Sequence, residues 1–256
     1  MTDASLPADR FAQSDFRVGN VFGRAWSVYS RNFLTFSLVT AIASLPSLLM
    51  PRAAPGAPPN FGVVGVLFLL LIVLGTLSQA VVLYGAFQVM RGRPVDLAES
   101  ARIGLRRFFP IVGLAIVVTL LVTLASILLL FPGLMLYTMW FVATPVCVVE
   151  QLGPFASMAR SRQLTKGHRW KIFGLLLLLL IPVLVIGAIV GVAAVAVTGG
   201  FLTLANAMAT TVGQIVNLAW NAIWTAFFAI LIVVTYHDLR VAKEGVDTDQ
   251  IAAVFE

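Results

Sequence analysis

The sequence has little charge, two histidines and one cysteine, and each shortage excludes a class of protein. Only 11% of its 256 residues are charged while 60% are hydrophobic, a balance outside the range of soluble globular domains. The lone cysteine, Cys147, excludes an intrachain disulfide and a cysteine-cluster metal site. The sequence contains no P-loop, Gly-x-Ser-x-Gly or His-Glu-x-x-His motif. We therefore predict a protein that is not an enzyme and that holds no metal or cofactor.

Long apolar runs are the main feature that the sequence does contain. They reach the roughly 17 residues that a helix needs to cross a hydrocarbon core of about 30 Å. Because lipid cannot satisfy free backbone N–H and C=O groups, such runs form helices or the strands of closed barrels. Barrel strands alternate apolar and polar residues, whereas residues 175–181 are apolar without a break. The sequence therefore predicts an all-α, polytopic integral membrane protein.

Six transmembrane helices are predicted within a single membrane domain. They cover residues 33–50, 61–87, 111–130, 134–149, 172–197 and 212–236. Phe131-Pro132-Gly133 is predicted to be the turn between the third and fourth spans, and Pro145 lies inside the fourth. Residues 198–211 are mildly polar and uncharged, which suits an interfacial or re-entrant segment. Residues 237–256 are predicted to be a short soluble tail.

Three basic amphipathic segments are predicted to be helices that lie in the membrane interface. They cover residues 16–31, 94–107 and 154–166. Arg17, Arg24 and Arg31 recur every seven residues, so they would form one ridge along the first of these helices. In the third, Phe155, Met158 and Ala159 are predicted to share an apolar side.

Each amphipathic segment precedes a basic–aromatic joint and a pair of spans. One interpretation is a three-fold internal repeat whose copies are parallel, related by an axis along the membrane normal. The other is that any cytoplasmic loop leading into a membrane is basic and then aromatic. The sequence leaves both interpretations open.

The basic residues predict the orientation of the chain. Sixteen of the 17 lysines and arginines fall in the N-terminal segment, the second and fourth loops and the tail, and Arg52 alone falls on the other side. The excess of positive charge in cytoplasmic loops then places both termini in the cytoplasm. Because these charges lie next to spans, the net charge of +6 indicates attraction to anionic lipid and not to nucleic acid.

A few polar residues fall at predicted membrane depth. Gln79 lies in the second predicted span, and Asn217 and Asn221 lie one turn apart in the sixth. They would line a polar cavity in a transporter or channel for a small apolar or amphipathic solute. Otherwise they form hydrogen bonds between helices, each contributing under about 1 kcal/mol.

A hydrolase site is the third alternative. Glu150, His168, His237 and Asp238 all fall at the predicted cytoplasmic boundary, where they would be able to converge. Their spacing matches no ligand motif, and Glu150 is equally suited to pairing with a nearby arginine, either Arg160 or Arg169.

Three stretches together resemble a family of bacterial membrane proteins. They are FRVGNVFGRAWSVYSRNF, SMARSRQLTKGHRWKIFG and YHDLRVAKEG. They resemble six-span proteins related to the glycerophosphoryl diester phosphodiesterase membrane domain and to YciC-like proteins. The resemblance implies a bacterial inner (plasma) membrane protein in a family whose members mostly lack an assigned activity. Where members carry phosphodiesterase chemistry, it belongs to a separate soluble domain, so the resemblance assigns no catalytic residue here.

The resulting hypothesis is a non-catalytic protein that organises anionic lipid, or a partner protein, at the cytoplasmic face. It rests on arginine-bearing interfacial helices beside spans without internal charge. The expected contacts are Arg17, Arg24, Arg31, Arg102, Arg106, Arg160, Arg169 and Lys171, with Trp26 and Trp170 as interfacial anchors. The alternative interpretation is that these residues only set topology and dock the helices.

Overall fold

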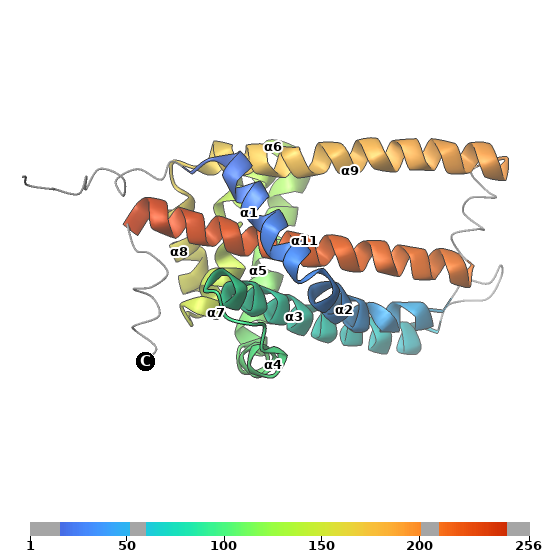
Figure 1. Cartoon of the computed structure of the whole chain (residues 1–256), viewed down its shortest axis with the longest axis horizontal. Coiled ribbons are helices and arrows are strands. Elements are labelled where there is room, and N and C mark those ends of the chain that lie inside the picture. Colours follow the sequence, from blue (N-terminus) through green and yellow to red (C-terminus); the bar gives the residue numbers. More distant parts are fainter. Residues whose placement is uncertain (1–15, 52–59, 201–209, 245–256) are drawn as a thin grey trace, which may run out of the picture.

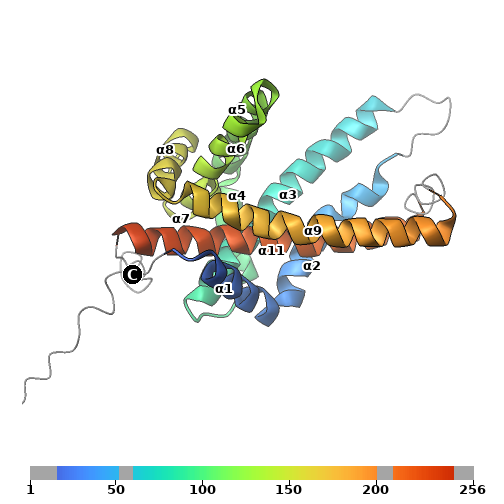
Figure 2. The same cartoon turned by 90° about the horizontal axis from the view of Figure 1, so that it is seen from above.

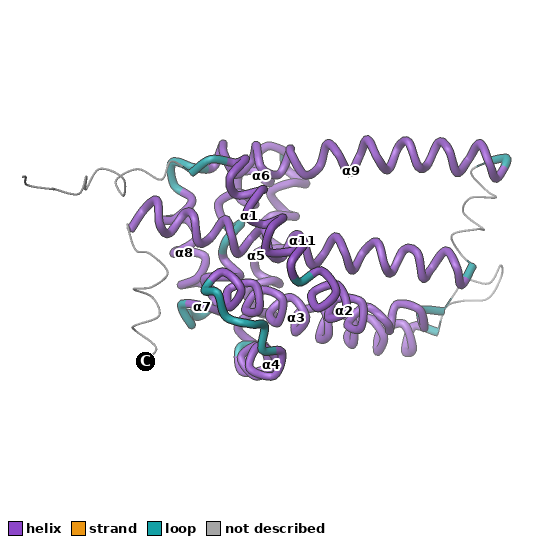
Figure 3. The backbone as a smooth tube through the Cα atoms, viewed as in Figure 1, coloured by secondary structure: helices purple, strands orange, loops and turns teal. Residues whose placement is uncertain are grey.

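The computed structural model describes residues 16–51, 60–200 and 210–244, and all regular structure within these ranges is helical (Figures 1 and 3). The elements are α1 (Val18–Arg31), α2 (Phe33–Ser44), the 3-10 helix η2 (Leu45–Leu49), α3 (Phe61–Met90), α4 (Leu97–Arg106), α5 (Phe108–Leu128), α6 (Leu130–Met139), α7 (Ala143–Val149), α8 (Pro154–Thr165), α9 (Arg169–Thr198) and α11 (Thr211–Glu244). Each of α1, α4 and α8 is followed by two stretches of helix, namely α2–η2 and α3, α5 and α6–α7, and α9 and α11.

Five helices are long and apolar enough to cross a membrane, which fits a membrane protein. They are α3, α5, α9, α11 and the stretch formed by α6 and α7, which counts as one. A sixth span exists if the pair formed by α1 and α2–η2, which is bent by 83°, counts as one crossing. The predicted span at residues 33–50 thus corresponds to α2–η2, with Pro46 in the first turn of η2.

The helices pack at one end of the molecule and diverge toward the other. Figure 2 shows the pairs α2–α3, α5–α6 and α9–α11 pointing in different directions from a common base. Buried residues gather at that base, in the C-terminal halves of α3 and α11 and the N-terminal turns of α5 and α9. The outer halves are exposed, as at Phe61 (77%) and Val197 (87%). A bilayer would cover these outer apolar surfaces.

Helix α1 has one buried face and one exposed face. Val21, Ala25 and Val28 are buried at i, i+4, i+7 spacing, while Arg24 and Arg31 are exposed. Its buried face packs on α11 and α3. The helix begins at Val18 and not at residue 16, so Arg17 is its N-cap residue while Arg24 and Arg31 lie within it.

The predicted turn at Phe131-Pro132-Gly133 is wrong, because these residues lie inside α6. The chain reverses at Leu129 alone, which is extended (φ −159°, ψ 134°). Pro132 is tolerated in the first turn of α6, where its missing N–H would have had no helical partner. Spans α5 and α6 nevertheless form the expected antiparallel hairpin.

The fourth predicted span is broken in two. Helix α6 ends at Met139 and α7 begins at Ala143, two residues before Pro145. A proline removes one backbone donor and crowds the preceding turn, which accounts for the break. The Met139 carbonyl, left free by the break, accepts hydrogen bonds from the hydroxyls of Ser161 (3.0 Å) and Thr165 (3.1 Å) of α8.

The predicted apolar side of α8 is also wrong. Phe155 is 73% exposed and Ala159 is exposed, whereas Met158 is buried. The face that packs on α5, α7 and α11 consists largely of small polar residues and Leu164. Their hydroxyls donate hydrogen bonds to backbone carbonyls. Helix α8 therefore packs on its neighbours through the close approach of small residues more than through apolar burial.

The predicted tail at residues 237–256 is wrong for its first eight residues. Helix α11 continues to Glu244, and Leu239 is fully buried. The chain has no glycine or proline between Tyr236 and Gly245 to stop the helix. Most of the predicted interfacial segment at residues 198–211 and the remainder of the tail lie outside the described residues.

Candidate functional site

The end of the molecule that bears α1, α4 and α8 carries every described lysine and arginine, and we call it the cationic end. Of the 17 basic residues, Arg10 and Arg52 fall outside the described ranges, which leaves 15. The outer halves of α3, α5, α9 and α11 contain neither lysine nor arginine. Charge and core packing therefore occupy the same end of the protein.

All five carboxylates in the described ranges accept hydrogen bonds from within the protein. They are Asp96, Glu99, Glu150, Asp238 and Glu244. Their internal partners matter because a carboxylate held by a neighbour offers little to a ligand or to a second protein. Three clusters of polar side chains hold them.

The first cluster fixes α4 to the end of α3. The Tyr84 hydroxyl and the Gln88 side-chain amide donate to the Glu99 carboxylate at 2.8 and 2.9 Å. The Gln88 carbonyl oxygen accepts from the backbone N–H of Asp96 at 2.8 Å. Asp96 in turn caps α4 by accepting from the Glu99 backbone N–H at 2.9 Å. These bonds place the arginine-bearing face of α4 away from α3.

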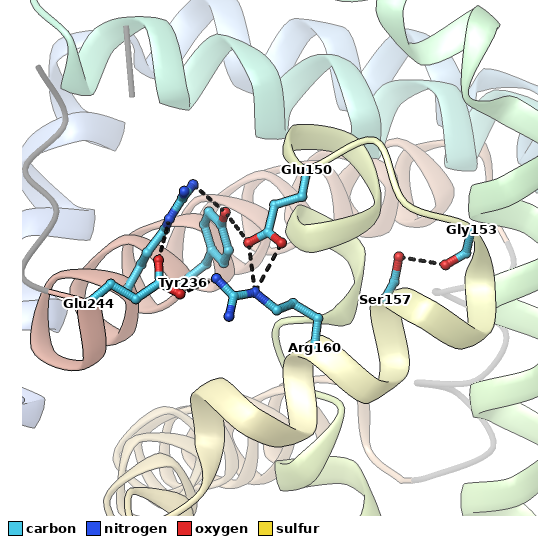
Figure 4. A network of polar contacts seen from close by, with 7 residues as sticks. Glu150, Gly153, Ser157, Arg160, Tyr236 and Glu244 are labelled. Carbon is cyan, nitrogen blue, oxygen red and sulfur yellow. Dashed lines mark hydrogen bonds and ion pairs between the residues drawn. The ribbon is translucent and has the colours of Figure 1, made fainter. Parts of the chain in front are cut away.

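The second cluster joins α7, α8 and α11 (Figure 4). Tyr236 donates its hydroxyl hydrogen to Glu150 at 2.9 Å, and Arg160 Nε donates to the two Glu150 oxygens at 3.0 and 3.3 Å. Arg160 also pairs with Glu244. Arg240 completes the cluster by donating to Glu244 at 3.0 Å and to the Tyr236 oxygen at 3.2 Å. We call these five residues the Tyr236 network.

Charges within the Tyr236 network are balanced. Burial alone would lower the pKa of Arg160, but its hydrogen bond to Glu244 and the charge of Glu150 outweigh burial and raise the pKa. Arg160 therefore stays charged, and two arginines face two carboxylates. Of the two pairings predicted for Glu150, the structure selects Arg160, which is consequently engaged inside the protein.

The third cluster holds α1 on α11. The Arg24 guanidinium pairs with Asp238, whose Oδ1 also lies 3.3 Å from His237 Nδ1. Arg24 remains 49% exposed in its side chain, so only part of the guanidinium is covered. This pair fixes one position of the predicted arginine ridge to the protein itself.

The other predicted cations remain available at the surface. Those that are exposed and form no ion pair with a described residue are Arg17, Arg31, Arg102, Arg106 and Lys171. Arg169 is half-buried and helps to line a small pocket of about 70 Å³ with Trp170 and Phe173 of α9 and apolar residues of α6. The two predicted anchors, Trp26 (57%) and Trp170 (71%), are exposed.

The predicted intramembrane polar residues do not form a common site in the described residues. Gln79 is half-buried, and Asn217 and Asn221 are exposed on the outer half of α11. Asn221 accepts a hydrogen bond from Thr225, one turn along the same helix, at 3.3 Å. None of the three lines the pocket beside Arg169 or the apolar groove between α1, α9 and α11.

The four residues of the hydrolase alternative are divided between clusters. Glu150 belongs to the Tyr236 network, Asp238 and His237 to the α1–α11 contact, and the His168 ring packs against Phe16 at 5.6 Å. Among the described residues, no three His, Cys, Asp or Glu side chains are grouped so as to hold a metal ion.

Sequence reasoning missed Tyr236 as a partner of Glu150, and missed Arg240 and Glu244 as further members of the same network. Their spacing of four residues was visible in the sequence and is typical of neighbours on one helix face. This spacing did not lead to a prediction, because the helix was predicted to end at Tyr236, before Arg240 and Glu244.

The fold and the cationic end together define an all-helical protein of the membrane class, with several helices able to span a bilayer. Residues 114–239 match the model of a domain of unknown function (DUF7847), which runs from α5 to near the end of α11. The chain is thus similar to an uncharacterised family over this part of its length. No curated protein and no solved structure matches it.

Proposed function

We propose that the chain is a non-catalytic protein of the bacterial inner membrane that gathers anionic lipid at its cytoplasmic face. The contacts are the exposed cations Arg17, Arg31, Arg102, Arg106 and Lys171. Arg24 and Arg160, which the sequence also suggested, act chiefly in holding α1 and α8 in place. The interfacial anchors Trp26 and Trp170 flank these cations.

One observation carries the proposal: the described carboxylates are engaged internally, while the exposed arginines Arg17, Arg31, Arg102 and Arg106 form no ion pair with a described residue. A surface of this kind keeps its positive charge unneutralised. Each lysine or arginine near an anionic membrane surface contributes about 1 kcal/mol of attraction. Several together favour anionic over zwitterionic lipid by a large factor, at low ionic strength above all.

The proposal includes a six-span topology with α1, α4 and α8 lying in the interface. The 83° bend between α1 and α2–η2 supports it, because a helix along the interface meets a span at about a right angle. Confinement of the described basic residues to one end supports cytoplasmic placement of that end. A relationship to YciC-like proteins is proposed on the same sequence stretches as before and is compatible with the match to an uncharacterised family.

Native mass spectrometry of the purified protein tests the proposal. Wild type should retain phosphatidylglycerol in preference to phosphatidylcholine, and Arg17, Arg31, Arg102 and Arg106→Gln together should lose that preference. At about 1 kcal/mol per cation, each replaced arginine should cost roughly fivefold in affinity. A matched variant with the same four arginines changed to lysine keeps the charge and should behave as wild type.

Equal retention of phosphatidylglycerol by wild type and the glutamine variant would reject lipid binding by this surface. A protein that co-purifies with wild type and the lysine variant, but not with the glutamine variant, would assign the surface to a partner protein instead.

A further inference from the structure

The third pair of long helices differs from the first two. Helix α2 packs on α3, and α5 packs on α6, but α9 and α11 share no such interface over their described lengths. They run in nearly the same direction, separated in Figure 1 and overlapping in the turned view of Figure 2. Helix α1 contacts both of them and bridges the gap at the cationic end.

An apolar groove of about 210 Å³ lies where these three helices meet, and we call it the α1–α9–α11 groove. It is lined by Phe22, Trp26, Tyr29, Leu178, Leu179, Val183, Trp220, Ile223, Trp224 and Phe227. Every lining side chain is aliphatic or aromatic. Sites for compact drug-sized ligands occupy about 300–1,000 Å³, so this groove suits a narrower apolar group.

Aromatic contacts make one wall of the groove rigid. The Phe227 ring lies 5.6 Å from Phe22, 6.0 Å from Trp26, 5.7 Å from Tyr29 and 6.5 Å from Trp224, measured between ring centroids. Ring pairs at such distances stabilise one another beyond the burial of their surface. The groove is therefore preformed, which lowers the entropy lost when a ligand enters it.

The one hydroxyl in the lining is already satisfied. Tyr29 Oη lies 2.9 Å from the Ser37 hydroxyl and donates to the Ile223 carbonyl at 3.3 Å. A polar ligand group placed in the groove would lose its bonds to water, and only the indole N–H groups of the three lining tryptophans could donate to it in return. Burial of such a group without a hydrogen bond costs about 1–3 kcal/mol. The apolar lining therefore favours a hydrocarbon group.

Lys171 lies toward the cytoplasmic side of the α1–α9–α11 groove. Lys171 precedes Leu178 by seven residues, which is two helical turns, so both lie on the same face of α9. The separation along the helix axis is about 10 Å. Lys171 is exposed, and the described carboxylates all have other partners. A ligand that fits this arrangement has a negative headgroup joined to an apolar chain.

We propose that the α1–α9–α11 groove holds one acyl chain of an anionic glycerophospholipid from the adjacent leaflet, with the lipid phosphate at Lys171. The inference rests on the proposed function for the charge of the headgroup, and on the groove for the chain. A lipid held in this way fills the space that direct packing of α9 on α11 fills in an ordinary helical hairpin. It becomes part of the folded structure and not merely of its surroundings.

The test compares variants that fill the groove with variants that do not. Val183→Phe places a ring in the groove from α9, and Ile223→Phe does so from α11. Val185→Phe adds the same ring at an exposed α9 position outside the lining. Lys171→Gln removes the cation, and Lys166→Gln removes an exposed lysine that lies off the groove. Each protein is titrated in detergent with phosphatidylglycerol or phosphatidylcholine and measured by native mass spectrometry.

Wild type, Val185→Phe and Lys166→Gln should bind one tight phosphatidylglycerol. Val183→Phe and Ile223→Phe should each bind at least tenfold more weakly, whatever the headgroup, while keeping the wild-type unfolding temperature. Lys171→Gln should lower the affinity for phosphatidylglycerol roughly fivefold and leave phosphatidylcholine unchanged. Brominated phosphatidylglycerol should quench tryptophan fluorescence in wild type more than in Val183→Phe, because three tryptophans line the groove.

Unchanged affinity in both Val183→Phe and Ile223→Phe overturns the groove, even if the arginine variants lose lipid and so uphold the proposed function. Lipid loss in the filled variants without any headgroup preference upholds the chain site and rejects the proposed function. A dimer mass in wild type that disappears in Val183→Phe would show that the groove binds a second copy, and would also overturn the inference.

Discussion

At the scale of single residues, Tyr236 both fills the core with its ring and joins a polar network through its hydroxyl. Its ring is fully buried, and its hydroxyl lies between Glu150, to which it donates, and Arg240, from which it accepts. Through that oxygen, α7 and α11 share a network with α8. A single atom therefore influences how three helices meet.

Tyr236→Phe removes only this oxygen and should lower the free energy of unfolding by about 1–2 kcal/mol, since Arg240 and Glu150 each lose a partner. Titration with sodium dodecyl sulfate, followed by circular dichroism, measures the change. Tyr84→Phe is the matched control, because the Tyr84 hydroxyl bonds to Glu99 at an exposed position. A loss no greater than that of the control would mean that the network contributes little to stability.

Gly133 permits the close approach of α5 and α6. A Cβ at this position would lie 2.8 Å from Ser126 Cβ and 2.9 Å from Ser126 Cα, closer than carbon atoms pack. Gly133→Ala should therefore force the hairpin open and destabilise the protein by about 1–3 kcal/mol. The midpoint of thermal unfolding in detergent reports the effect.

Gly174→Ala serves as its control, since a Cβ there meets nothing within 4 Å and alanine is the better helix former. It should leave the midpoint unchanged or raise it slightly. The hairpin argument fails if Gly133→Ala behaves in the same way.

At the scale of elements, the break between α6 and α7 depends on α8. Ser161 and Thr165 both donate to the Met139 carbonyl, so either hydroxyl alone can satisfy it. Ser161→Ala and Thr165→Val should each lower the free energy of unfolding by under about 1 kcal/mol. The double variant leaves a partly buried carbonyl without a partner and should lose about 1–3 kcal/mol.

A double-mutant cycle on these two positions measures the coupling directly. We expect the double variant to lose more than the sum of the single variants. Strict additivity would indicate that the two hydroxyls act independently and that the break does not need them.

Some helices and helix faces could be predicted from the sequence, and others could not. The long spans followed from apolar length alone, and α1 was recognisable because its arginines and apolar residues keep strict helical spacing. The buried face of α8 was not recognisable, since Ser161 packs through a hydroxyl–carbonyl bond to Met139, a residue 22 positions earlier. The end of α11 was misplaced because its last turns are charged yet are joined to α7 and α8 by the Tyr236 network. The local spacing of apolar and charged residues predicts helices. It does not predict their buried faces or their ends where hydrogen bonds between helices replace apolar burial.

At the scale of the whole molecule, the crossing of α2–η2 decides between five spans and six. With six, Ser30 and Phe61, both exposed, lie on opposite sides of the membrane. In a Cys147→Ala background, Ser30→Cys and Lys243→Cys should react with an impermeant maleimide only in inverted vesicles. Phe61→Cys should react only in spheroplasts. Reaction of Ser30→Cys and Phe61→Cys from the same side would reduce the count to five.

The divergence of the three helix pairs from a common base gives the protein unequal cross-sections in the two leaflets. Near the cationic end the helices pack on one another, whereas the outer halves of the three pairs stand apart and are exposed (Figure 2). The molecule is a wedge, and a wedge relieves or increases the bending stress stored in a flat lipid layer. Its folding free energy should therefore vary with the content of cone-shaped lipids such as phosphatidylethanolamine.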